Sequence, residues 1–465
     1  MYPERFIQRI NSQKYVDAEG LLKALEDPSP VSIRLNRSKL DKNPLNSMTV
    51  PWCSAGFYLE SRPSYTLDPL FHSGCYYPQE ASGMFLEQVF KQVSTGDGYL
   101  RVLDLCAAPG GKSTHLSSLI GSRGLLIANE VIKTRASILA ENITKWGNSN
   151  TIVTRNDPSA FSELYGFFDI ILVDAPCSGE GMFRDQIAVT EWSEENASHC
   201  SERQKRILTD VWPSLRENGI LIYSTCTFNP GENEENVKWM INKYQAETMD
   251  IAISDFKGIT EIEYQGIKGY GFYPGRIKGE GLFISVLRKT GLSGSIKRRI
   301  RKKPDGELNK ADIEIVKEWT RFPAESTIRE EDQIFSLPAS NEDYNLLKQN
   351  LRITKTGTRI CTSKKNGYVP DHELALSEGI RKEAFPAAEL DYNDAIRYLR
   401  RDNIMPFDTS KGWFTATYKG VNMGFCNNIG NRVNNYYPVD WRIRMSIPEN
   451  RKNNFIRWDQ KTFFN

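Results

Sequence analysis

The sequence predicts an α/β fold in which a mostly parallel sheet is covered by helices on both faces. Between about residues 101 and 245, short runs that are apolar throughout alternate with segments that carry apolar residues at helical spacing. A strand that is apolar at every position is buried on both sides, which is typical of parallel sheets. An antiparallel hairpin, expected within residues 271–289, then closes one edge of the sheet.

Strands and helices are expected to follow one another in strict alternation. The expected strands cover residues 101–106, 124–130, 151–157, 168–177 and 219–227. Helices are expected over 109–120, around 136–143, over 201–215 and around 237–244, because apolar residues recur there on one face. This alternation predicts that successive parallel strands are joined by helices that cover the sheet.

The chain is too long for one hydrophobic core, since it has 465 residues. Six basic residues between 297 and 303, flanked by Gly, Ser and Pro, indicate a linker. The expected divisions are a small N-terminal α+β domain over 1–75, the α/β core over 76–290, a basic linker over 291–310, a small α+β domain over 311–380, and a C-terminal domain over 385–465 that contains one helix and then strands.

Composition narrows the class of protein. The net charge is only +2, so any contact with nucleic acid must come from local basic patches. The first ten residues lack the apolar segment of a signal peptide, and no uninterrupted apolar run is long enough to cross a bilayer, so we expect a cytoplasmic protein. Eight cysteines without a Cys-x-x-Cys pair, and four histidines, predict neither a metal site nor disulfides.

A nucleotide-like ligand is expected at the carboxyl ends of the first three strands. Gly110 and Gly111 in CAAPGGK permit a tight turn before a helix, but the pattern is neither Gly-x-Gly-x-x-Gly nor a P-loop. Glu130 ends the second strand, where an acid can bind a ribose, and Asp157 ends the third, where it could face an adenine amino group. Each acid alone is more often just solvated. Together they predict adenosine without phosphates, which suits S-adenosylmethionine.

Two cysteines end two different strands of this sheet. Cys177 and Cys226 lie where their strands pass into loops, beside the expected ligand. A thiolate can add to carbon-6 of a pyrimidine, and the resulting enamine can take a methyl group at carbon-5. Asp174 would then serve the N3 edge of the base, which requires a protonated carboxyl. The other thiols are expected to act as small core residues, namely Cys53, Cys75, Cys200, Cys361, Cys426 and mainly Cys106.

At this point the motifs are recognisable. The segments CAAPGGK (106–112), DAPCSGEGMFR (174–184), RQKRIL (203–208) and STCTFNPGENE (224–234) closely resemble the Sun/RsmF family of RNA cytosine-5 methyltransferases. The stretch 413–444 resembles the PUA-like RNA-binding domain of the RsmF branch, so the similarity runs over nearly the whole chain. The resemblance implies a Rossmann-like class I methyltransferase core between a small N-terminal α+β domain and a PUA-like domain.

The resemblance also implies a role for individual positions. Cys226 would be the nucleophile, Cys177 would assist release of the methylated base, and Lys112 would lie near the reacting groups with Asp174. The expected S-adenosylmethionine site comprises Cys106, Ala107, Ala108, Pro109, Gly110, Gly111, Lys112, Glu130, Arg135, Asp157 and Asp174. The implied reaction is methylation of cytosine carbon-5 in 16S ribosomal RNA through a covalent Cys–cytosine intermediate.

Three alternatives to this reaction stay open. The substrate could be transfer RNA, the chain could be a non-catalytic RNA-binding ribosome assembly factor, or the two cysteines could form a redox dithiol. The missing Cys-x-x-Cys pair argues against the last. RNA is expected to meet a basic helix face with Arg397, Arg400 and Arg401, and the target base must leave its stack. The basic run 297–303 is expected to be solvated, and the aromatics Trp413, Tyr418, Tyr436, Tyr437 and Trp441 are expected to be mostly core, although they could stack on bases.

Overall fold

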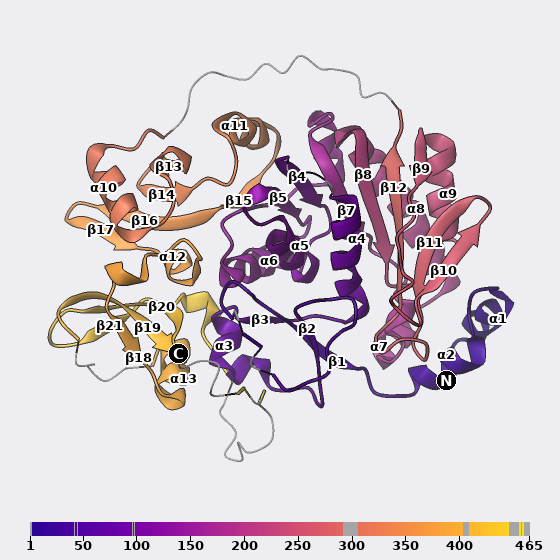
Figure 1. The fold of residues 1–465 in the computed structure, drawn as a ribbon, viewed down its shortest axis with the longest axis horizontal. Helices are drawn as coiled ribbons and strands as arrows, with labels where there is room; N and C mark the ends of the chain where they lie inside the picture. Colours follow the sequence, from indigo (N-terminus) through magenta and orange to yellow (C-terminus); the bar gives the residue numbers. More distant parts are fainter. Residues whose placement is uncertain are drawn as a thin grey trace.

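A ten-stranded mixed sheet forms the centre of the molecule in the computed structural model (Figure 1). The structure describes residues 2–445 except 41, 44, 95, 97, 292–305 and 403–408, together with residues 455, 456, 458 and 459. The basic run expected at 297–303 therefore lies outside the described residues. None of the described helices is long and apolar enough to cross a membrane.

Five parallel strands make up the middle of the sheet, which confirms the predicted α/β fold. Their order is β8-β7-β4-β5-β6. Their bounds are Leu215–Thr225 for β8, Phe168–Asp174 for β7, Leu100–Asp104 for β4, Gly124–Asn129 for β5 and Thr151–Thr154 for β6. The expected segments each overlap one of these strands, but β4 begins one residue and β8 four residues before the expected start, at Leu100 and Leu215. The last residues of each expected segment lie in the loops that follow the strands.

Antiparallel strands close the sheet at both edges. Next to β8 lie β12 (Leu282–Lys289), β11 (Ile267–Phe272) and β10 (Thr260–Tyr264), and β9 (Ala246–Thr248) also pairs with β12. The predicted hairpin is therefore present, but its first strand begins at Ile267 and ends just before Pro274, whose ring cannot donate a ladder hydrogen bond. At the other edge, β15 (Ile353–Thr356) pairs with β6, which the sequence analysis did not predict.

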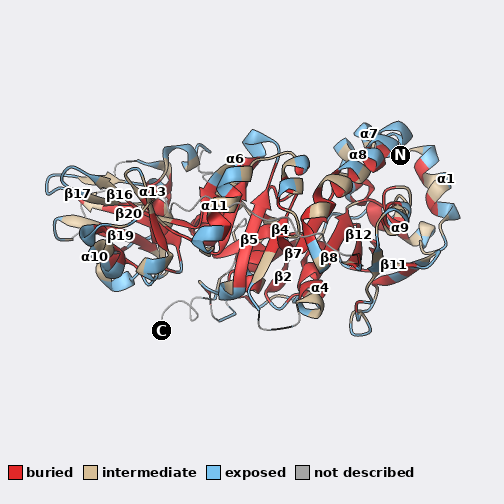
Figure 2. Ribbon diagram, turned by 90° about the horizontal axis from the view of Figure 1, so that it is seen from above, coloured by how far each residue is buried: buried red, intermediate tan, exposed pale blue. Residues whose placement is uncertain are grey.

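Side chains alternate between two cores on the two faces of the sheet. Leu103 and Ile171 face one core, which includes α8 (Glu194–Val211), α9 (Glu234–Lys243) and α11 (Asn341–Asn350). Val102 and Leu172 face the other, with α4 (Leu86–Val93) and α5 (Gly111–Ile120), while α6 (Lys133–Trp146) packs on β5 and β6. Figure 2 shows the strands buried between these helices. The continuous apolar character of the strands follows from this double burial.

Local sequence signals set the ends of these helices. Ser193 caps α8 by accepting a hydrogen bond from the Asn196 backbone N–H, and Pro213 follows soon after the helix ends. Gly147 ends α6 in the left-handed conformation, with φ of 89°. A Cβ at Gly147 would lie 2.2 Å from the Leu376 carbonyl oxygen, so glycine is required there by both conformation and space.

The N-terminal region contains two helices and a three-stranded antiparallel sheet. These are α1 (Glu4–Ser12), α2 (Ala18–Leu25), β1 (Val31–Leu35), β2 (Gly56–Leu59) and β3 (Tyr76–Pro78), in the sheet order β2-β1-β3. Because β3 pairs with β1, this sheet extends three residues past the expected division at residue 75. The short helix α3 (Pro69–His72) packs between this sheet and the C-terminal part of the chain.

Two four-stranded sheets follow the core (Figure 1). The first contains β13 (Thr327–Glu330), β14 (Gln333–Ser336), β16 (Thr358–Lys364) and β17 (Gly367–Pro370), flanked by α10 (Lys310–Trp319) and α12 (His372–Leu376). The second contains β18 (Ala387–Glu389), β19 (Gly412–Tyr418), β20 (Val421–Asn428) and β21 (Val433–Asn435), with α13 (Tyr392–Arg400) packed on it. The strand β15 comes from the first of these regions, so that region shares the central sheet.

The expected basic face of α13 is smaller than predicted. Arg397 lies on the helix and pairs with Asp394, but Arg401 lies beyond the helix end in the left-handed conformation, with φ of 62°. Arg401 is exposed, but its guanidinium donates a hydrogen bond to the Tyr437 carbonyl and so is partly engaged within the domain. Tyr437 itself is fully buried, whereas Tyr436 is exposed and packs edge-on against Trp413. Most of the C-terminal aromatics are thus part of the local core.

One buried arginine joins the N-terminal sheet to the core. Arg34 of β1 is 1% exposed. Its Nε donates to Gln79 Oε1 at 2.8 Å and its Nη2 to Thr114 Oγ1 at 2.6 Å, and its guanidinium lies 4.3 Å from the ring centroid of Trp146. Because Thr114 is in α5, Arg34 fixes the N-terminal sheet against the helix that follows the glycine loop.

We expect Arg34→Ala to lower the free energy of unfolding by about 3 kcal/mol, because it leaves buried polar partners without a donor. Urea unfolding followed by circular dichroism measures this loss. Arg37→Ala is the matched control, since Arg37 is exposed and its guanidinium donates to the Ser54 carbonyl and lies 5.9 Å from the Phe57 ring centroid, at the edge of the structure rather than in its core. Its effect should stay within about 0.5 kcal/mol. Equal losses in the two variants would contradict the role of Arg34.

Candidate active site

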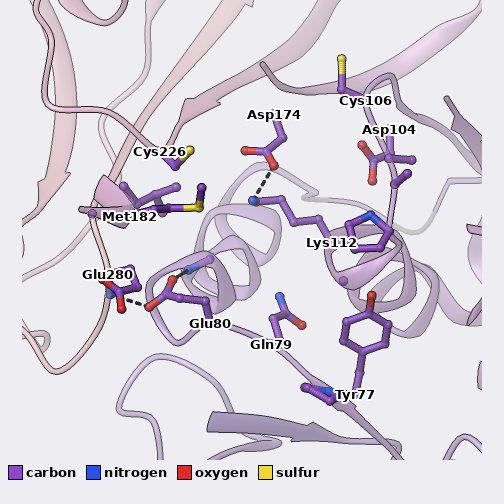
Figure 3. A pocket seen from close by; sticks show the side chains of 18 residues that line it. Tyr77, Gln79, Glu80, Asp104, Cys106, Lys112, Asp174, Met182, Cys226 and Glu280 are labelled. Atoms are coloured by element: carbon purple, nitrogen blue, oxygen red, sulfur yellow. Dashed lines mark hydrogen bonds and ion pairs between the residues drawn. The ribbon is translucent and has the colours of Figure 1, made fainter. Parts of the chain in front are cut away.

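A cavity lies at the carboxyl ends of β4, β7 and β8, where the glycine loop meets the two cysteine-bearing loops (Figure 3). This is the usual place for ligands in open α/β sheets. Of the predicted site residues, its wall contains Cys106, Ala107, Ala108, Pro109, Gly111, Lys112, Asp174 and Cys226. Residues that the sequence analysis did not single out also line it, among them Tyr77, Gln79, Glu80, Asp104, Met182 and Glu280.

The glycine loop has the backbone geometry that its sequence predicts. Gly110 has φ of 119° and precedes the first residue of α5, Gly111. A Cβ at Gly111 would lie 3.3 Å from the Tyr77 ring, on the cavity side of the loop. Thr114 donates its N–H to the Gly110 carbonyl, which begins the helix directly behind the turn. The loop therefore brings main-chain atoms to the cavity wall without side chains in the way.

Lys112 and Asp174 form an ion pair across the cavity. Lys112 Nζ lies 2.7 Å from Asp174 Oδ2, and Ser224 Oγ donates to Asp174 Oδ1 at 2.7 Å. Figure 3 shows the lysine chain reaching from α5 toward Asp174, with Cys226 on the next loop. Burial alone would lower the pKa of Lys112, but the Asp174 carboxylate outweighs this effect and raises it. The lysine therefore holds its proton at neutral pH and presents it to the carboxylate.

The two predicted cysteines lie side by side. Their sulfur atoms are 2.9 Å apart, and the backbone N–H of Cys226 points to Cys177 Sγ at 3.3 Å. Cys226 lines the cavity, whereas Cys177 lies behind it. The hydrogen bond to Cys226, together with burial, raises the pKa of the Cys177 thiol well above its ordinary value. Cys177 thus keeps its proton and can donate it toward the Cys226 sulfur.

Asp104 is the clearest site residue that the sequence analysis missed. It is fully buried at the end of β4, Oδ2 accepts a hydrogen bond from Ser113 Oγ at 2.6 Å, and Oδ1 has no partner among the described residues. Burial raises the pKa of Asp104 to about 7. The signal that could have found it is its position: like Glu130, it is an acid at the carboxyl end of a strand of the parallel sheet.

Glu80 is a second missed residue in the cavity wall. Its carboxylate accepts hydrogen bonds from the backbone N–H groups of Ser82, Gly83 and Glu280. Burial raises the pKa of Glu80. The contact to Glu280 ties the segment after β3 to the connection between β11 and β12, so Glu80 shapes the rim of the cavity.

Four predicted ligand-binding residues lie outside the cavity lining, namely Gly110, which forms the turn of the glycine loop, Glu130, Arg135 and Asp157. Glu130 accepts from the Ile132 N–H at 3.0 Å and lies 3.5 Å from Arg135, which in turn donates to the Ala108 carbonyl at 2.9 Å. Both are therefore tied to the glycine loop. Asp157 caps the helical turn after β6 by accepting the Ser159 N–H. Its role in ligand binding stays a prediction.

A cluster of metal-ligating residue types lies in the core on the α4 side of the sheet. Atoms of Cys53, Glu87 and His115 all lie within 4.8 Å of one another. Glu87 already accepts hydrogen bonds from Lys91 and from the Ser54 N–H, and His115 Nε2 lies 3.3 Å from it. His115 Nδ1 has no partner among the described residues, whereas a ligating histidine usually donates from its second nitrogen. These contacts favour a buried carboxylate–imidazole pair.

Three family models match the chain. They are the 16S rRNA methyltransferase RsmB/F over residues 95–288, the N-terminal domain of 16S rRNA methyltransferase RsmF over 2–81, and the methyltransferase RsmF PUA domain over 385–443. The ribosomal RNA small subunit methyltransferase F of Vibrio campbellii is 30% identical, with 94% of this chain and 96% of that protein covered. The protein of the same name from Klebsiella pneumoniae is 29% identical, with the same shares covered.

Solved structures show the same fold for the core. A methyltransferase homolog protein from Pyrococcus horikoshii is 29% identical with a TM-score of 0.53, and the match covers 62% of this chain and 95% of that chain. NSun6 from Pyrococcus horikoshii with SFG is 23% identical with a TM-score of 0.51, over 62% of this chain and 98% of that chain. The latter likeness concerns the fold alone.

The raised pKa of Asp104 predicts a pH-dependent stability. The proton of Asp104 stabilises the folded protein fully below about pH 4, and this contribution is lost as the pH rises to about 7. We therefore expect Asp104→Asn to stabilise the ligand-free protein at pH 8, by on the order of 3 kcal/mol relative to its effect at pH 4. Urea unfolding at several pH values measures the difference.

Asp157→Asn serves as the control for this measurement. Burial opposes ionisation of Asp157, but the hydrogen bonds from Ser159 and the nearby Arg206 guanidinium together outweigh this effect and lower its pKa. Its stabilising contribution is therefore present at neutral pH and lost in acid, so this variant should be less stable than the parent at pH 8. A pH-independent effect of Asp104→Asn would contradict the prediction.

Proposed function

The chain belongs to the RsmF family of 16S ribosomal RNA methyltransferases, and we propose that it methylates carbon-5 of a cytosine in small-subunit ribosomal RNA through a covalent bond between Cys226 and the base. The observation that carries this proposal is the placement of Cys226 in the cavity wall, 2.9 Å from Cys177 and on the same side as the Lys112–Asp174 ion pair. In this proposal residues 76–290 form the catalytic part, and residues 385–465 form an RNA-binding part.

The residues around the glycine loop fit S-adenosylmethionine. Asp104 Oδ1 is a buried acceptor without a partner among the described residues, which suits the ammonium group of the methionine portion. A Cβ on residue 111 would narrow the part of the cavity between the glycine loop and the Tyr77 ring, so Gly111 keeps room for the cofactor there. Glu130, directly after the end of β5, suits a ribose hydroxyl pair. When bound, the cofactor supplies an electrophilic methyl group. Arg135 supports this edge by holding the Ala108 carbonyl.

Cys226 acts as the nucleophile in this proposal. Carbon-5 of cytosine is a poor nucleophile until a thiolate adds to carbon-6 and turns the ring into an enamine. The Cys177 thiol is kept protonated by its hydrogen bond to Cys226, so it can stabilise negative charge on that sulfur without competing for the base. The thiol that faces the cavity is thus the one that attacks.

Lys112 and Asp174 supply the proton that this addition requires. As the carbon–sulfur bond forms, the electron pair moves to ring nitrogen N3, which must be protonated. Both Asp174 oxygens accept hydrogen bonds, from Lys112 and from Ser224, so the carboxylate has no proton of its own to give. The proton that N3 takes up therefore comes from the Lys112 ammonium and passes through the Asp174 carboxylate, which leaves the lysine neutral. After methylation, carbon-5 loses its proton to solvent, the carbon–sulfur bond breaks so that Cys226 leaves as a thiolate, and the N3 proton returns to Lys112 through Asp174. The Cys177 thiol lies 2.9 Å from the Cys226 sulfur and can donate a hydrogen bond to the departing thiolate.

Substituting each cysteine separately by alanine tests the role proposed for it. Cys226→Ala should abolish methyl transfer, because the other thiol among the described residues that line the cavity is Cys106, whose pKa is raised by burial, so it is a poor source of thiolate. Cys177→Ala should still form the bond to RNA but fail to release it, so a protein–RNA adduct should accumulate and survive a denaturing gel. The reverse pattern would exchange the assigned roles. Full activity of Cys226→Ala would favour a non-catalytic assembly factor, and a reversible disulfide without methyl transfer would favour a redox dithiol.

Parallel assays on two RNAs test the substrate. We expect label from S-adenosylmethionine to enter 16S ribosomal RNA or the small subunit, with 5-methylcytosine as the product found by nucleoside analysis. Transfer RNA is the control substrate, because the same chemistry would serve either RNA. The RsmF-type match of the N-terminal and C-terminal regions favours the ribosomal substrate. Label in transfer RNA alone would contradict it.

A further inference from the structure

Two buried glutamates connect the loops that carry Cys177 and Cys226. Glu180, three residues after Cys177, accepts a hydrogen bond from the Phe228 backbone N–H at 3.2 Å. Glu232, six residues after Cys226, accepts one from the Ser178 backbone N–H at 3.0 Å and another from the Ser178 hydroxyl. Each loop therefore sends a carboxylate to the main chain of the other, directly beside its cysteine.

Both carboxylates are 0% exposed, so their charges need compensation from the protein. Glu232 is held by neutral donors, including Gln204 Nε2 at 2.9 Å, and burial raises its pKa. Glu180 also accepts from Trp192 Nε1 at 2.9 Å and forms an ion pair with Arg9. The positive charge that compensates the buried Glu180 carboxylate thus comes from Arg9 of the N-terminal helix α1.

Side chains of α1 and of the residue that follows it also donate hydrogen bonds to the main chain of the Cys226 loop. Arg9 Nη1 donates to the Phe228 carbonyl at 3.3 Å and Gln13 Nε2 donates to the same oxygen at 3.0 Å. The peptide groups on both sides of Phe228 are therefore held, its N–H by Glu180 and its carbonyl by α1 and the following residue. Phe228 comes two residues after Cys226 in the chain.

Apolar contacts dock α1 on both loops at once. Phe6 is fully buried, and its ring centroid lies 4.8 Å from that of Phe183, which follows the Cys177 loop. Phe228 of the other loop belongs to the same cluster of buried side chains. In Figures 1 and 2 α1 lies at the end of the molecule that also contains α7 (Gln186–Glu191), which begins shortly after Phe183. The helix thus covers the outer side of the two loops.

We propose that Glu180 and Glu232 are positioning residues that hold the two catalytic loops in register, and that Arg9 of the N-terminal helix completes this clamp. The proposal rests on the function proposed above for Cys226. Without Arg9, Glu180 becomes a buried carboxylate without its cation, and the strain is relieved by movement of the loop or entry of water. The distance between the two sulfur atoms and the orientation of the Cys226 side chain toward the cavity then change.

Kinetics of Arg9 variants test the clamp. Arg9→Ala should lower kcat by about 30-fold, because a small displacement of a nucleophile has a large effect on rate, while KM for RNA changes by less than about 3-fold. Arg9→Lys keeps the charge but not the planar fork, so its kcat should lie between those of Arg9→Ala and the parent. If Arg9→Ala fails to fold, the kcat and KM of Arg9→Lys provide the test instead.

Arg5→Ala is the matched control, since Arg5 lies on the same helix with a side chain that is 72% exposed and a single ion pair of 3.9 Å to Glu194. It should stay within about 2-fold of the parent in both constants. If Arg9→Ala matches Arg5→Ala, the clamp is wrong. If Arg9→Ala raises KM with kcat unchanged, Arg9 serves RNA binding instead and the proposal is likewise overturned.

A double variant tests whether Arg9 acts through Glu180. Arg9→Met combined with Glu180→Gln removes both charges, so the double variant should be no more impaired than the worse single variant. Losses that multiply would show that the two residues act separately, and would overturn the clamp. A role of Arg9 in binding RNA phosphates predicts no such coupling.

Alkylation of Cys226 by iodoacetamide, followed by mass spectrometry of the peptide, separates this proposal from the proposed function. The alkylation rate and its pH profile report the setting of the thiol without methyl transfer. A changed profile in Arg9→Ala but not in Arg5→Ala supports the clamp even if Cys226→Ala proves active. An unchanged profile, with Cys226→Ala inactive, overturns the clamp and leaves the proposed function standing.

Discussion

The parallel pairing of β7 with β8 is the constraint on which the site depends. In this register Asp174 lies opposite Ser224, and the hydrogen bond between their side chains follows from it. Cys177 comes three residues after Asp174 and Cys226 two residues after Ser224, so both thiols leave the sheet at neighbouring points. A slip by one residue would turn every side chain of one strand to the other face and separate them. Thiols 49 residues apart in the chain therefore meet because of strand register.

The site concentrates buried acids, which is unfavourable for folding. Asp104, Glu80 and Glu232 are carboxyl groups whose pKa burial raises, and each lies at the cavity or just behind the cysteines. Groups with such shifts are held in place by the rest of the structure and are common at functional sites. Two further acids of the site each pair with a cation, Asp174 with Lys112 and Glu180 with Arg9. Glu80 and Glu232 accept hydrogen bonds from main-chain N–H groups, which also fixes the loops that supply those groups. Asp104 instead accepts from the Ser113 hydroxyl.

Local sequence patterns predicted the sheet and much of the site. The apolar strands, the glycine loop and the two cysteines at strand ends could be found because each depends on nearby residues. The strand β15 could not, since its four residues ITKT carry little strand signal and pair with a strand some 200 positions away. Asp104 resembled the other acids at strand ends, and only the packed structure reveals that one of its oxygens lacks a partner. Asp157 differs from Asp104, because its carboxylate already has a hydrogen-bond partner: it caps the turn after β6 by accepting the Ser159 N–H.

A parallel sheet fixes where its strands end, but it does not fix the loops beyond. Here those loops are held from outside the sheet. Glu80, which follows β3, binds the connection before β12, while Arg9 of α1 and Gln13, the residue that follows α1, bind the loop after β8. Gly181 continues the chain of contacts, since its N–H donates to the Cys226 carbonyl and its carbonyl accepts the Gly281 N–H. A Cβ at Gly181 would lie 2.8 Å from that Cys226 oxygen, so this crossing requires glycine. The N-terminal region is thus part of the scaffold of the site, and its removal would leave the strands in register but the thiols without fixed positions.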